Sequence, residues 1–287
     1  MEIKSKISDL VRSKKTQLPT LPVVVDNILK LANDDNTSIK DLADFISKDQ
    51  AISNKILKIA NSAYYGFVND VDTVNRAIII IGLNEVIGVT IGMSVFKTFS
   101  QNGGDNVLDM RALWLHSIAC ALTAKELAKK AKMVEAEEIF LNGLLHDTGK
   151  VIFAVYFPEE YRAVLDDAVQ SQRPLYLAEK EKLGLDHATL SGLLMERWHF
   201  PESLLLPSRF HHNVAKCPNS YQTRAMMVQL ANFLCQKASI GHSGNPVNSK
   251  VEKISQKVGI SLKDVETVFK DLKKKRSEIE EFVKVIN

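Results

Sequence analysis

The sequence predicts an all-α fold. Apolar residues recur at i, i+3 and i+4, the spacing of one helix face, along most of the chain, and several of these stretches begin with a helix-capping pattern. Alternation of apolar and polar residues, the pattern of a half-buried strand, is nowhere convincing. With 45% hydrophobic and 25% charged residues the composition is that of a folded globular protein, and 287 residues provide one large domain or two modest ones.

Two helices near the N-terminus are marked by their first residues. Ser38 and Asp41 form a capping-box pattern, and Asp49 is a candidate N-cap for the helix that follows. Each signal precedes apolar residues that share one face, namely Leu42, Phe45 and Ile46 in the first helix and Ile52, Ile56, Leu57 and Ile59 in the second.

The isoleucine run at residues 78–81 has strand propensity, but its surroundings favour a helix. Gly82 follows it as a helix stop, and a further apolar segment continues to Phe99. The longest uncharged tract there, residues 86–96, is far shorter than the ~20 residues of a membrane helix. We therefore expect buried helices and no membrane segment.

The rest of the chain continues the helical pattern. Helices are expected over residues 110–131, 139–146 and 219–238, with shorter ones after Pro158 and beginning near Pro174, Asp186 and Pro201. Residues 101–106 and 239–249 are rich in Gly, Asn or Ser and are predicted to be a break and a linker. Ser261 and Asp264 then form another capping box ahead of a charged terminal helix.

Charge and cysteine content exclude several classes of protein. A net charge of +3 is too small to indicate a nucleic-acid partner, and the basic run at residues 273–276 adjoins glutamates, as on a solvated helix face. Three widely spaced cysteines with no CxxC pair indicate neither a disulfide framework nor a thiolate zinc site. Residues 1–15 lack the apolar core of a signal peptide, so we expect a soluble cytoplasmic protein.

Histidines supply the candidate chemistry. His146 and Asp147 end an apolar helix and precede Thr148-Gly149-Lys150, so an imidazole and a carboxylate can reach one divalent cation such as manganese, iron or zinc. His116 lies on an earlier helix, His187 begins a later one, and His211-His212 ends another; packed helices can bring all of them together. The alternative for each is a hydrogen-bonded core histidine. His199 and His242 are expected on the surface or in loops.

The segment Leu144-Leu145-His146-Asp147-Thr148-Gly149-Lys150 resembles the signature of HD-type metal-dependent phosphohydrolases, with His116 matching the first histidine. The N-terminal half resembles the HDOD family, a bacterial signalling module related to those enzymes. Three segments carry this likeness: Leu18-Pro19-Thr20-Leu21-Pro22, Ile46-Ser47-Lys48-Asp49, and Asn61-Ser62-Ala63-Tyr64-Tyr65-Gly66. Arg76-Ala77-Ile78 and Ile81-Gly82 continue it, while Gln50 stands where the family commonly has proline.

The resemblance implies a domain organisation. Residues 1–17 are expected to be an N-terminal helix or extension, and residues 18–240 the HDOD domain. Within it, residues 18–105 form an N-terminal bundle packed on an HD-like core of residues 106–240. Residues 241–287 are the linker and C-terminal helices. Asn61 and Ser62 are expected to satisfy backbone groups at a helix end, and Tyr64 and Tyr65 are either core or an exposed contact.

The resemblance also implies site residues. The expected metal ligands are His116, His146, Asp147, His187, His211, His212 and Asn232. His187 and the His211-His212 pair resemble the additional histidines of HD-GYP cyclic-dinucleotide phosphodiesterases, but the chain continues Asn213-Val214-Ala215 where the GYP element belongs. HDOD proteins have commonly lost the metal ligands that this chain keeps, whereas Asn232 replaces the last aspartate and brings no charge.

Three hypotheses follow. The first is a non-catalytic regulatory protein that acts through another signalling protein or through a nucleotide or other phosphate-bearing ligand in its pocket. The second is a metal-dependent phosphohydrolase of nucleotides or cyclic (di)nucleotides, in which Asp147 and Lys150 are catalytic and Lys150 pairs with phosphate. The third is a scaffold with an empty pocket. Metal content separates the third from the others, and turnover separates the first two.

Overall fold

A computed structural model describes residues 2–12, 23–32, 38–67, 69–100, 107–247 and 254–286. Within these residues all regular structure is helical, which confirms the predicted fold class. The N-terminal helices are α1 (Glu2–Arg12), α2 (Val23–Ala32), α3 (Ile39–Ser47), α4 (Gln50–Ala60), α5 (Val74–Ile81) and α6 (Leu83–Ser100). The central ones are α7 (Met110–Lys130), α8 (Ala136–Leu145), α9 (Thr148–Tyr156), α10 (Pro158–Gln170), α11 (Leu175–Leu183), α12 (His187–Arg197), α13 (Glu202–Phe210), the 3-10 turn η2 (Val214–Lys216) and α14 (Asn219–Ala238). The chain ends with α15 (Ile254–Lys257), α16 (Leu262–Lys274) and α17 (Arg276–Ile286).

The predicted caps are present. The Ser38 hydroxyl accepts a hydrogen bond from the Asp41 N–H at 3.1 Å, and the Asp41 carboxylate accepts one from the Ser38 N–H at 2.9 Å. The Asp49 carboxylate accepts from the N–H groups of Ala51 and Ile52, each at 3.0 Å. These bonds satisfy donors that have no partner in the first turn of a helix, so they fix where α3 and α4 begin.

The isoleucine run is helical, as its surroundings predicted. The Thr73 hydroxyl caps the start of α5 by accepting a hydrogen bond from the Arg76 N–H at 3.3 Å. Gly82 ends the helix with a φ of 100°, a backbone conformation that residues with a Cβ rarely adopt. The local caps therefore override the strand propensity of the isoleucines.

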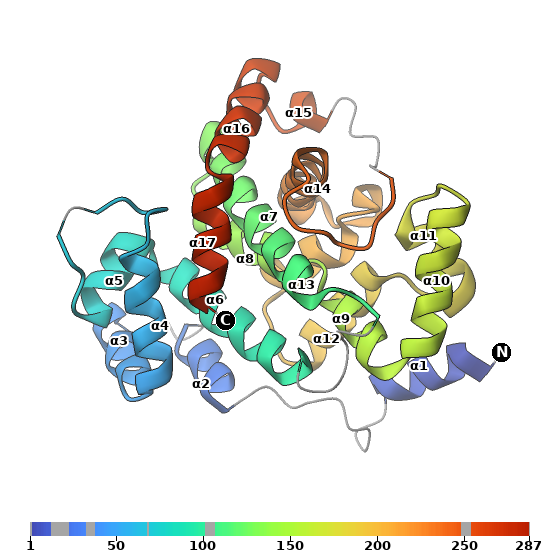
Figure 1. Ribbon diagram of the computed structural model, residues 1–287, viewed down its shortest axis with the longest axis horizontal. Helices are drawn as coiled ribbons and strands as arrows, with labels where there is room; N and C mark the ends of the chain where they lie inside the picture. Colours follow the sequence, from blue (N-terminus) through green and yellow to red (C-terminus); the bar gives the residue numbers. More distant parts are fainter. Residues whose placement is uncertain are drawn as a thin grey trace.

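Helix α7 is the central element of the fold. It packs against α8, α14, α16 and α17, and Figure 1 shows these helices running close to it in the middle of the molecule. Helices α2 to α5 form a bundle on one side, and α6 leads from that bundle into the core, where it packs on α8 and α9. The predicted packing of the N-terminal bundle on the HD-like core is thereby confirmed.

A buried ion pair crosses the boundary between bundle and core. Lys125 Nζ on α7 lies 3.0 Å from Glu85 Oε2 on α6, and the two side chains are 10% and 2% exposed. The Tyr65 hydroxyl donates to the same carboxylate oxygen at 3.2 Å. Buried charges are tolerated when they are paired in this way, so these contacts hold the bundle in one position on the core.

A proline breaks the hydrogen-bond pattern of α13. Pro207 has no N–H to donate to the Ser203 carbonyl four residues earlier. The Asn142 amide on α8 replaces it by donating to the carbonyls of Ser203 at 3.1 Å and Leu204 at 2.9 Å. This cross-helix bond ties α13 to α8, and both helices end at histidines of the candidate site.

The segment expected to be a linker is packed in the part that the structure describes. We call residues 240–247 the strap. Ile240 and Ser243 are buried, and the His242 N–H donates to the Ala112 carbonyl of α7 at 3.0 Å. The Asn245 side chain accepts a hydrogen bond from the Leu175 N–H at 3.0 Å, which holds the far end of the strap on α11.

Several sequence predictions fall outside the described residues. These are the Leu18-Pro19-Thr20-Leu21-Pro22 motif, the break at residues 101–106, and the last two residues of the expected linker, Asn248 and Ser249. Among the described helices, no single one is both long and apolar enough to cross a membrane, and the apolar pair formed by α5 and the first part of α6 is bent by 107°.

Candidate metal centre

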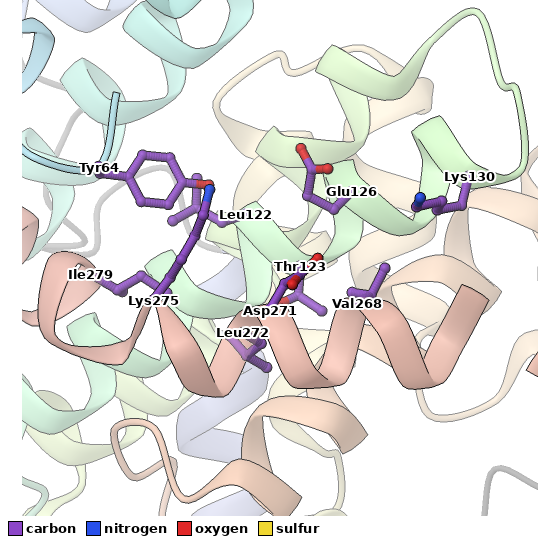
Figure 2. A pocket seen from close by; sticks show the side chains of 10 residues that line it. All are labelled: Tyr64, Leu122, Thr123, Glu126, Lys130, Val268, Asp271, Leu272, Lys275 and Ile279. Carbon is purple, nitrogen blue, oxygen red and sulfur yellow. The ribbon is translucent and has the colours of Figure 1, made fainter. Parts of the chain in front are cut away.

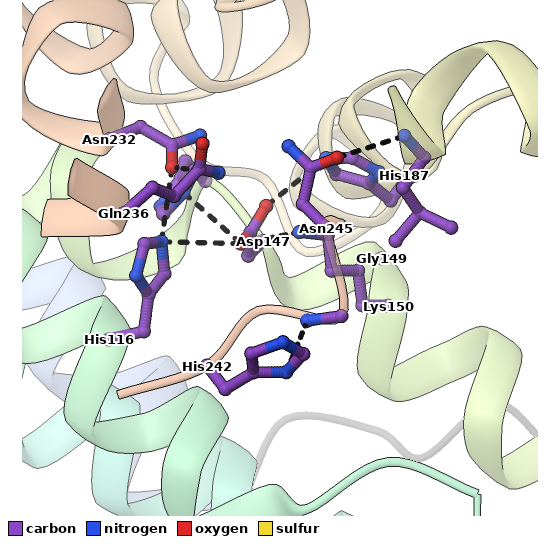
Figure 3. Close-up of polar contacts among 12 residues, drawn as sticks. His116, Asp147, Gly149, Lys150, His187, Asn232, Gln236, His242 and Asn245 are labelled. Carbon is purple, nitrogen blue, oxygen red and sulfur yellow. Dashed lines mark hydrogen bonds and ion pairs between the residues drawn. The ribbon is translucent and has the colours of Figure 1, made fainter. Parts of the chain in front are cut away.

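The predicted ligands converge where several helices meet. His116 is in the second turn of α7, His146 and Asp147 link α8 to α9, and His187 begins α12. Of the other three, His211 and His212 follow the end of α13, and Asn232 lies on α14. Figure 3 shows His116, Asp147, His187 and Asn232 directed toward a common centre.

Glycine and serine contacts bring α9 and α12 together. A Cβ on Gly149 would lie only 2.1 Å from the His187 carbonyl oxygen, so no larger residue fits without moving one helix. The Gly149 N–H donates to the Ser191 hydroxyl at 2.8 Å, and that hydroxyl donates to the His146 carbonyl at 3.0 Å. Position 149 of the His-Asp-Thr-Gly-Lys motif therefore has a structural role, which is to place His187 beside Asp147.

The first group of possible ligands consists of His116, His146 and Asp147, whose ligand atoms all lie within 4.8 Å of one another. The Nε2 atoms of His146 and His116 lie 3.3 Å and 3.8 Å from Asp147 Oδ2. His116 Nε2 also lies 3.1 Å from Asn232 Oδ1. All four residues are at most 4% exposed, so the group is enclosed by protein.

The second group consists of His187, His211 and His212, which meet the same 4.8 Å criterion. The Nε2 atoms of His187 and His212 lie 3.0 Å apart, and the Tyr176 ring stacks on His212 with centroids 4.4 Å apart. Asp147 Oδ1 lies 3.1 Å from His187 Nε2. The two oxygens of Asp147 therefore face different groups of histidines.

Three buried atoms favour metal binding over a purely hydrogen-bonded cluster. His146 Nε2, Asp147 Oδ1 and His211 Nε2 are buried without a hydrogen bond of normal geometry, although Asp147 Oδ1 lies 3.1 Å from His187 Nε2 and His146 Nε2 lies 3.3 Å from Asp147 Oδ2. In both histidines the other ring nitrogen, Nδ1, donates to a backbone carbonyl at 2.7 Å, that of Gly143 for His146 and that of Ser208 for His211. This arrangement leaves a lone pair on Nε2, as in metal-binding histidines, so the residues present fit a divalent transition metal.

The pKa shifts of most residues in this site also favour metal binding. Burial lowers the pKa of His116 to about 3 and holds those of His211 and His212 well below the ordinary value, so these imidazoles are neutral. Burial would raise the pKa of Asp147, but His146 and Lys150 outweigh it and hold the pKa well below its usual range. A neutral imidazole and an ionised carboxylate are the forms that bind metals.

His187 differs from the other imidazoles because of a residue that the sequence did not reveal. Burial would lower its pKa, but the Glu179 carboxylate outweighs this and, with Asp147, raises it to about 9. Glu179 Oε2 accepts hydrogen bonds from His187 Nδ1 at 2.6 Å and from its backbone N–H at 2.8 Å. The Tyr161 hydroxyl donates to Glu179 Oε1 at 2.9 Å. A metal bound at His187 Nε2 would displace a proton.

Lys150 and Asn232 each make a contact that matters for possible catalysis. Lys150 Nζ donates to Asp147 Oδ2 at 2.8 Å and is 1% exposed, so its charge is already compensated inside the protein. Asn232 Oδ1 accepts from Gln236 Nε2 at 2.9 Å in addition to facing His116. Gln236 is a second residue that the sequence analysis missed. The strap packs against this cluster at α7, where a Cβ on Gly241 would lie 2.3 Å from the His116 backbone nitrogen, and Figure 3 draws the strap residues His242 and Asn245 in the same view.

Comparison with known proteins identifies relatives of most of the chain. The family model of the HDOD domain matches residues 18–214. A protein of Treponema pallidum (strain Nichols) is 23% identical over 230 residues, which are 80% of this chain. The chain spans 44% of the length of that relative.

Solved structures share the fold. An HDOD domain protein of Geobacter sulfurreducens has a TM-score of 0.81 at 24% identity, covering 100% of this chain and 99% of that one. A candidate signal transduction protein of Marinobacter aquaeolei VT8 has a TM-score of 0.81 at 21% identity, covering 99% and 65%. A candidate phosphohydrolase of Shewanella amazonensis SB2B has a TM-score of 0.75 at 23% identity, covering 99% and 98%.

Proposed function

Because the chain belongs to the HDOD family, we propose that it is a bacterial regulatory protein whose histidine–aspartate pocket binds divalent metal without efficient phosphoester hydrolysis. The observation that carries the metal assignment is the set of buried Nε2 and carboxylate atoms without hydrogen bonds. The likeness to a candidate signal transduction protein supports a signalling role, with another signalling protein as the partner.

The proposed ligands divide into two groups around Asp147. His116, His146 and Asp147 would hold one metal, and His187, His211 and His212 would hold another, with the neutral Asn232 next to the first group. When bound, a divalent metal supplies Lewis-acid polarisation of a phosphoryl oxygen. Iron, manganese and zinc all suit imidazole and carboxylate ligands, so the donor set supports this class of metal.

Three features of the chain argue against efficient turnover. The Lys150 ammonium, the expected phosphate contact, is held by Asp147 at 2.8 Å. Asn232 brings no negative charge and its oxygen is engaged by Gln236. The strap packs on α7 at Ala112 and His116, so a phosphate-bearing substrate that approaches from this side would have to displace it. A nucleotide or other phosphate-bearing ligand remains a candidate regulator if the strap opens.

Metal content tests the proposal directly. Protein purified without chelator is analysed for iron, manganese and zinc, in parallel with His146→Ala and His199→Asn variants. We expect stoichiometric metal in the unmodified protein and its loss in His146→Ala with helicity retained. His199 is exposed and has a φ of 59°, which asparagine tolerates, so His199→Asn should keep its metal. Stoichiometric metal in His146→Ala would contradict the site.

The second candidate function is a metal-dependent phosphohydrolase of nucleotides or cyclic (di)nucleotides. It is favoured by Asp147, whose two oxygens face both groups of histidines in the manner of a two-metal site. In that case Asp147 and Lys150 would be the catalytic residues. The distinguishing assay measures turnover of a chromogenic phosphodiester and of cyclic dinucleotides with added manganese. We expect negligible rates, and brisk turnover that Asp147→Ala abolishes would establish the hydrolase instead.

A further inference from the structure

Helix α11 contacts the second group of proposed ligands without supplying a ligand itself. Two of its side chains, Tyr176 and Glu179, lie about one helical turn apart and reach different histidines of that group. The Tyr176 ring stacks on His212 with an interplanar angle of 11°, and Glu179 is hydrogen-bonded to His187. The third histidine, His211, is held by a backbone carbonyl three residues earlier in its own segment. Two of the three histidines in the second group therefore depend on α11 for their position.

Two hydrogen bonds join Glu179 to His187. The His187 backbone N–H donates to Glu179 Oε2 at 2.8 Å, and Nδ1 of the ring donates to the same oxygen at 2.6 Å. The backbone N–H lies in the first turn of α12, where no carbonyl of the helix can accept it, so Glu179 fixes the start of the helix as well as the ring. Because Nδ1 is held in this way, Nε2 faces Asp147, 3.1 Å from its Oδ1 atom.

The Glu179 carboxylate is itself held in place from α10. The Tyr161 hydroxyl donates to Glu179 Oε1 at 2.9 Å, and both side chains are 0% exposed. Burying a carboxylate is costly unless its oxygens are hydrogen-bonded, and here one oxygen binds Tyr161 and the other binds His187. An apolar side chain would fill this position without that cost. Packing alone therefore does not account for a glutamate between α10 and α12.

The turn from α11 into α12 brings Glu179 and His187 together. Gly184 ends α11 with a φ of 90°, a left-handed conformation that glycine adopts without strain. Asp186 then caps α12 by accepting a hydrogen bond from the Thr189 N–H at 2.7 Å. The chain reverses between these two residues, so a side chain near the end of α11 faces the first residue of α12. This turn places Glu179 beside His187 although the two residues are eight positions apart.

We propose that Glu179 is the positioning residue of the second metal site: it holds His187 with Nε2 directed at the ion, and so decides whether the chain binds one divalent metal ion or two. The inference rests on the proposed function, because it requires metal in the pocket. The ligands of the first group come from α7 and from the junction of α8 with α9, so they do not involve α11. Replacing a residue that orients a metal-bound histidine typically weakens metal binding by about 10–100-fold. Loss of Glu179 should therefore empty the second site and leave the first one occupied.

Equilibrium dialysis of the full-length protein against manganese chloride, followed by metal analysis, counts the ions bound to each chain. We expect two ions in the unmodified protein and one in Glu179→Leu, with the second bound at least about tenfold more weakly. Glu179→Gln should bind two, because an amide oxygen still accepts the hydrogen bond from His187 Nδ1. The control for a general loss of stability is Leu272→Ala. Leu272 lines a cavity of about 80 Å³ between α7 and α16 (Figure 2), and no proposed ligand lines that cavity, so this variant should keep both ions.

Two ions in Glu179→Leu, or loss of the second ion in Leu272→Ala as well, would overturn the inference. A single ion in the unmodified protein would also overturn it while leaving the proposed function intact, whereas no ion at all would contradict the proposed function itself. Nuclear magnetic resonance of unmodified protein with ¹⁵N-labelled histidine gives a test that needs no variant. We expect the His187 Nδ1 proton to persist when zinc is added, because Glu179 holds it while Nε2 binds the metal. Disappearance of that proton on zinc binding would refute the role of Glu179.

Discussion

Replacing Lys125 by methionine tests how much the buried ion pair contributes to the joint between bundle and core. The substitution keeps most of the length of the side chain and removes its charge. Among the described residues, Glu85, which is 2% exposed, would then keep the Tyr65 hydroxyl as its hydrogen-bond partner. Breaking a buried pair from one side costs about 3–5 kcal/mol, and we expect the lower end because the Tyr65 bond remains.

The loss should depend on pH. Burial raises the pKa of Glu85 above its ordinary value of 4.5 even though Lys125 opposes the shift. Without Lys125 the pKa rises further. A carboxyl whose pKa is higher in the folded than in the unfolded state stabilises the fold below the unfolded pKa, and that stability is lost as the pH rises through the folded pKa. The loss of unfolding free energy in Lys125→Met should therefore be larger at about pH 8 than at about pH 5.

Denaturant unfolding followed by circular dichroism measures the effect. The control is Lys129→Met on the same helix, an exposed residue 2.8 Å from Glu126, which should change the free energy of unfolding by less than about 1 kcal/mol. The double variant Glu85→Gln with Lys125→Met should recover most of the loss. A single variant as stable as the unmodified protein at pH 8, or a double variant no better than the single, would refute the reasoning.

Three further outcomes are expected. Gly149→Ala should lower the free energy of unfolding by about 2 kcal/mol or more, because its Cβ would meet the His187 carbonyl at 2.1 Å, and denaturant unfolding with metal analysis should find both stability and metal reduced. Asn142→Leu should cost about 1–3 kcal/mol by leaving a carbonyl of α13 without a donor, and Pro207→Ala in the same chain should restore part of it; strictly additive effects would count against the bond. Asn232→Asp should raise any phosphodiester turnover above that of the unmodified protein, and equal silence from both would leave binding as the role of the pocket.

The helical caps show why much of the fold is predictable from the sequence. Ser38, Asp49 and Thr73 act on N–H groups within three residues, so their effect is visible in the local sequence. The all-α prediction rested on such signals together with apolar spacing. The 240–247 strap was predicted as part of a linker because Gly, Ser, Asn and Pro are typical of linkers. Its backbone bond to Ala112, more than a hundred residues earlier, has no local signal.

In the site, too, residues with a local sequence signal could be predicted and residues held by long-range contacts could not. The possible ligand atoms of His116, His146 and Asp147 lie within 4.8 Å of one another, and the His-Asp motif was the local signal that drew attention to this place. Glu179 escaped notice because it sits among charged residues in a segment that resembles a solvated helix. One signal was present, since Glu179 shares a face with Leu175 and Leu183 at i, i+4 and i+8, and a lone carboxylate on an apolar face needs a buried partner.

The close approach of α7 to α8, and of α9 to α12, has a consequence for how far such sequences can diverge. A Cβ on Gly143 would lie 2.7 Å from the Ala121 Cα, and one on Gly149 would meet the His187 carbonyl. Direct backbone contacts therefore set the distances between the helices that carry the histidines. Apolar side chains elsewhere in the core can be exchanged for others without moving the ligands.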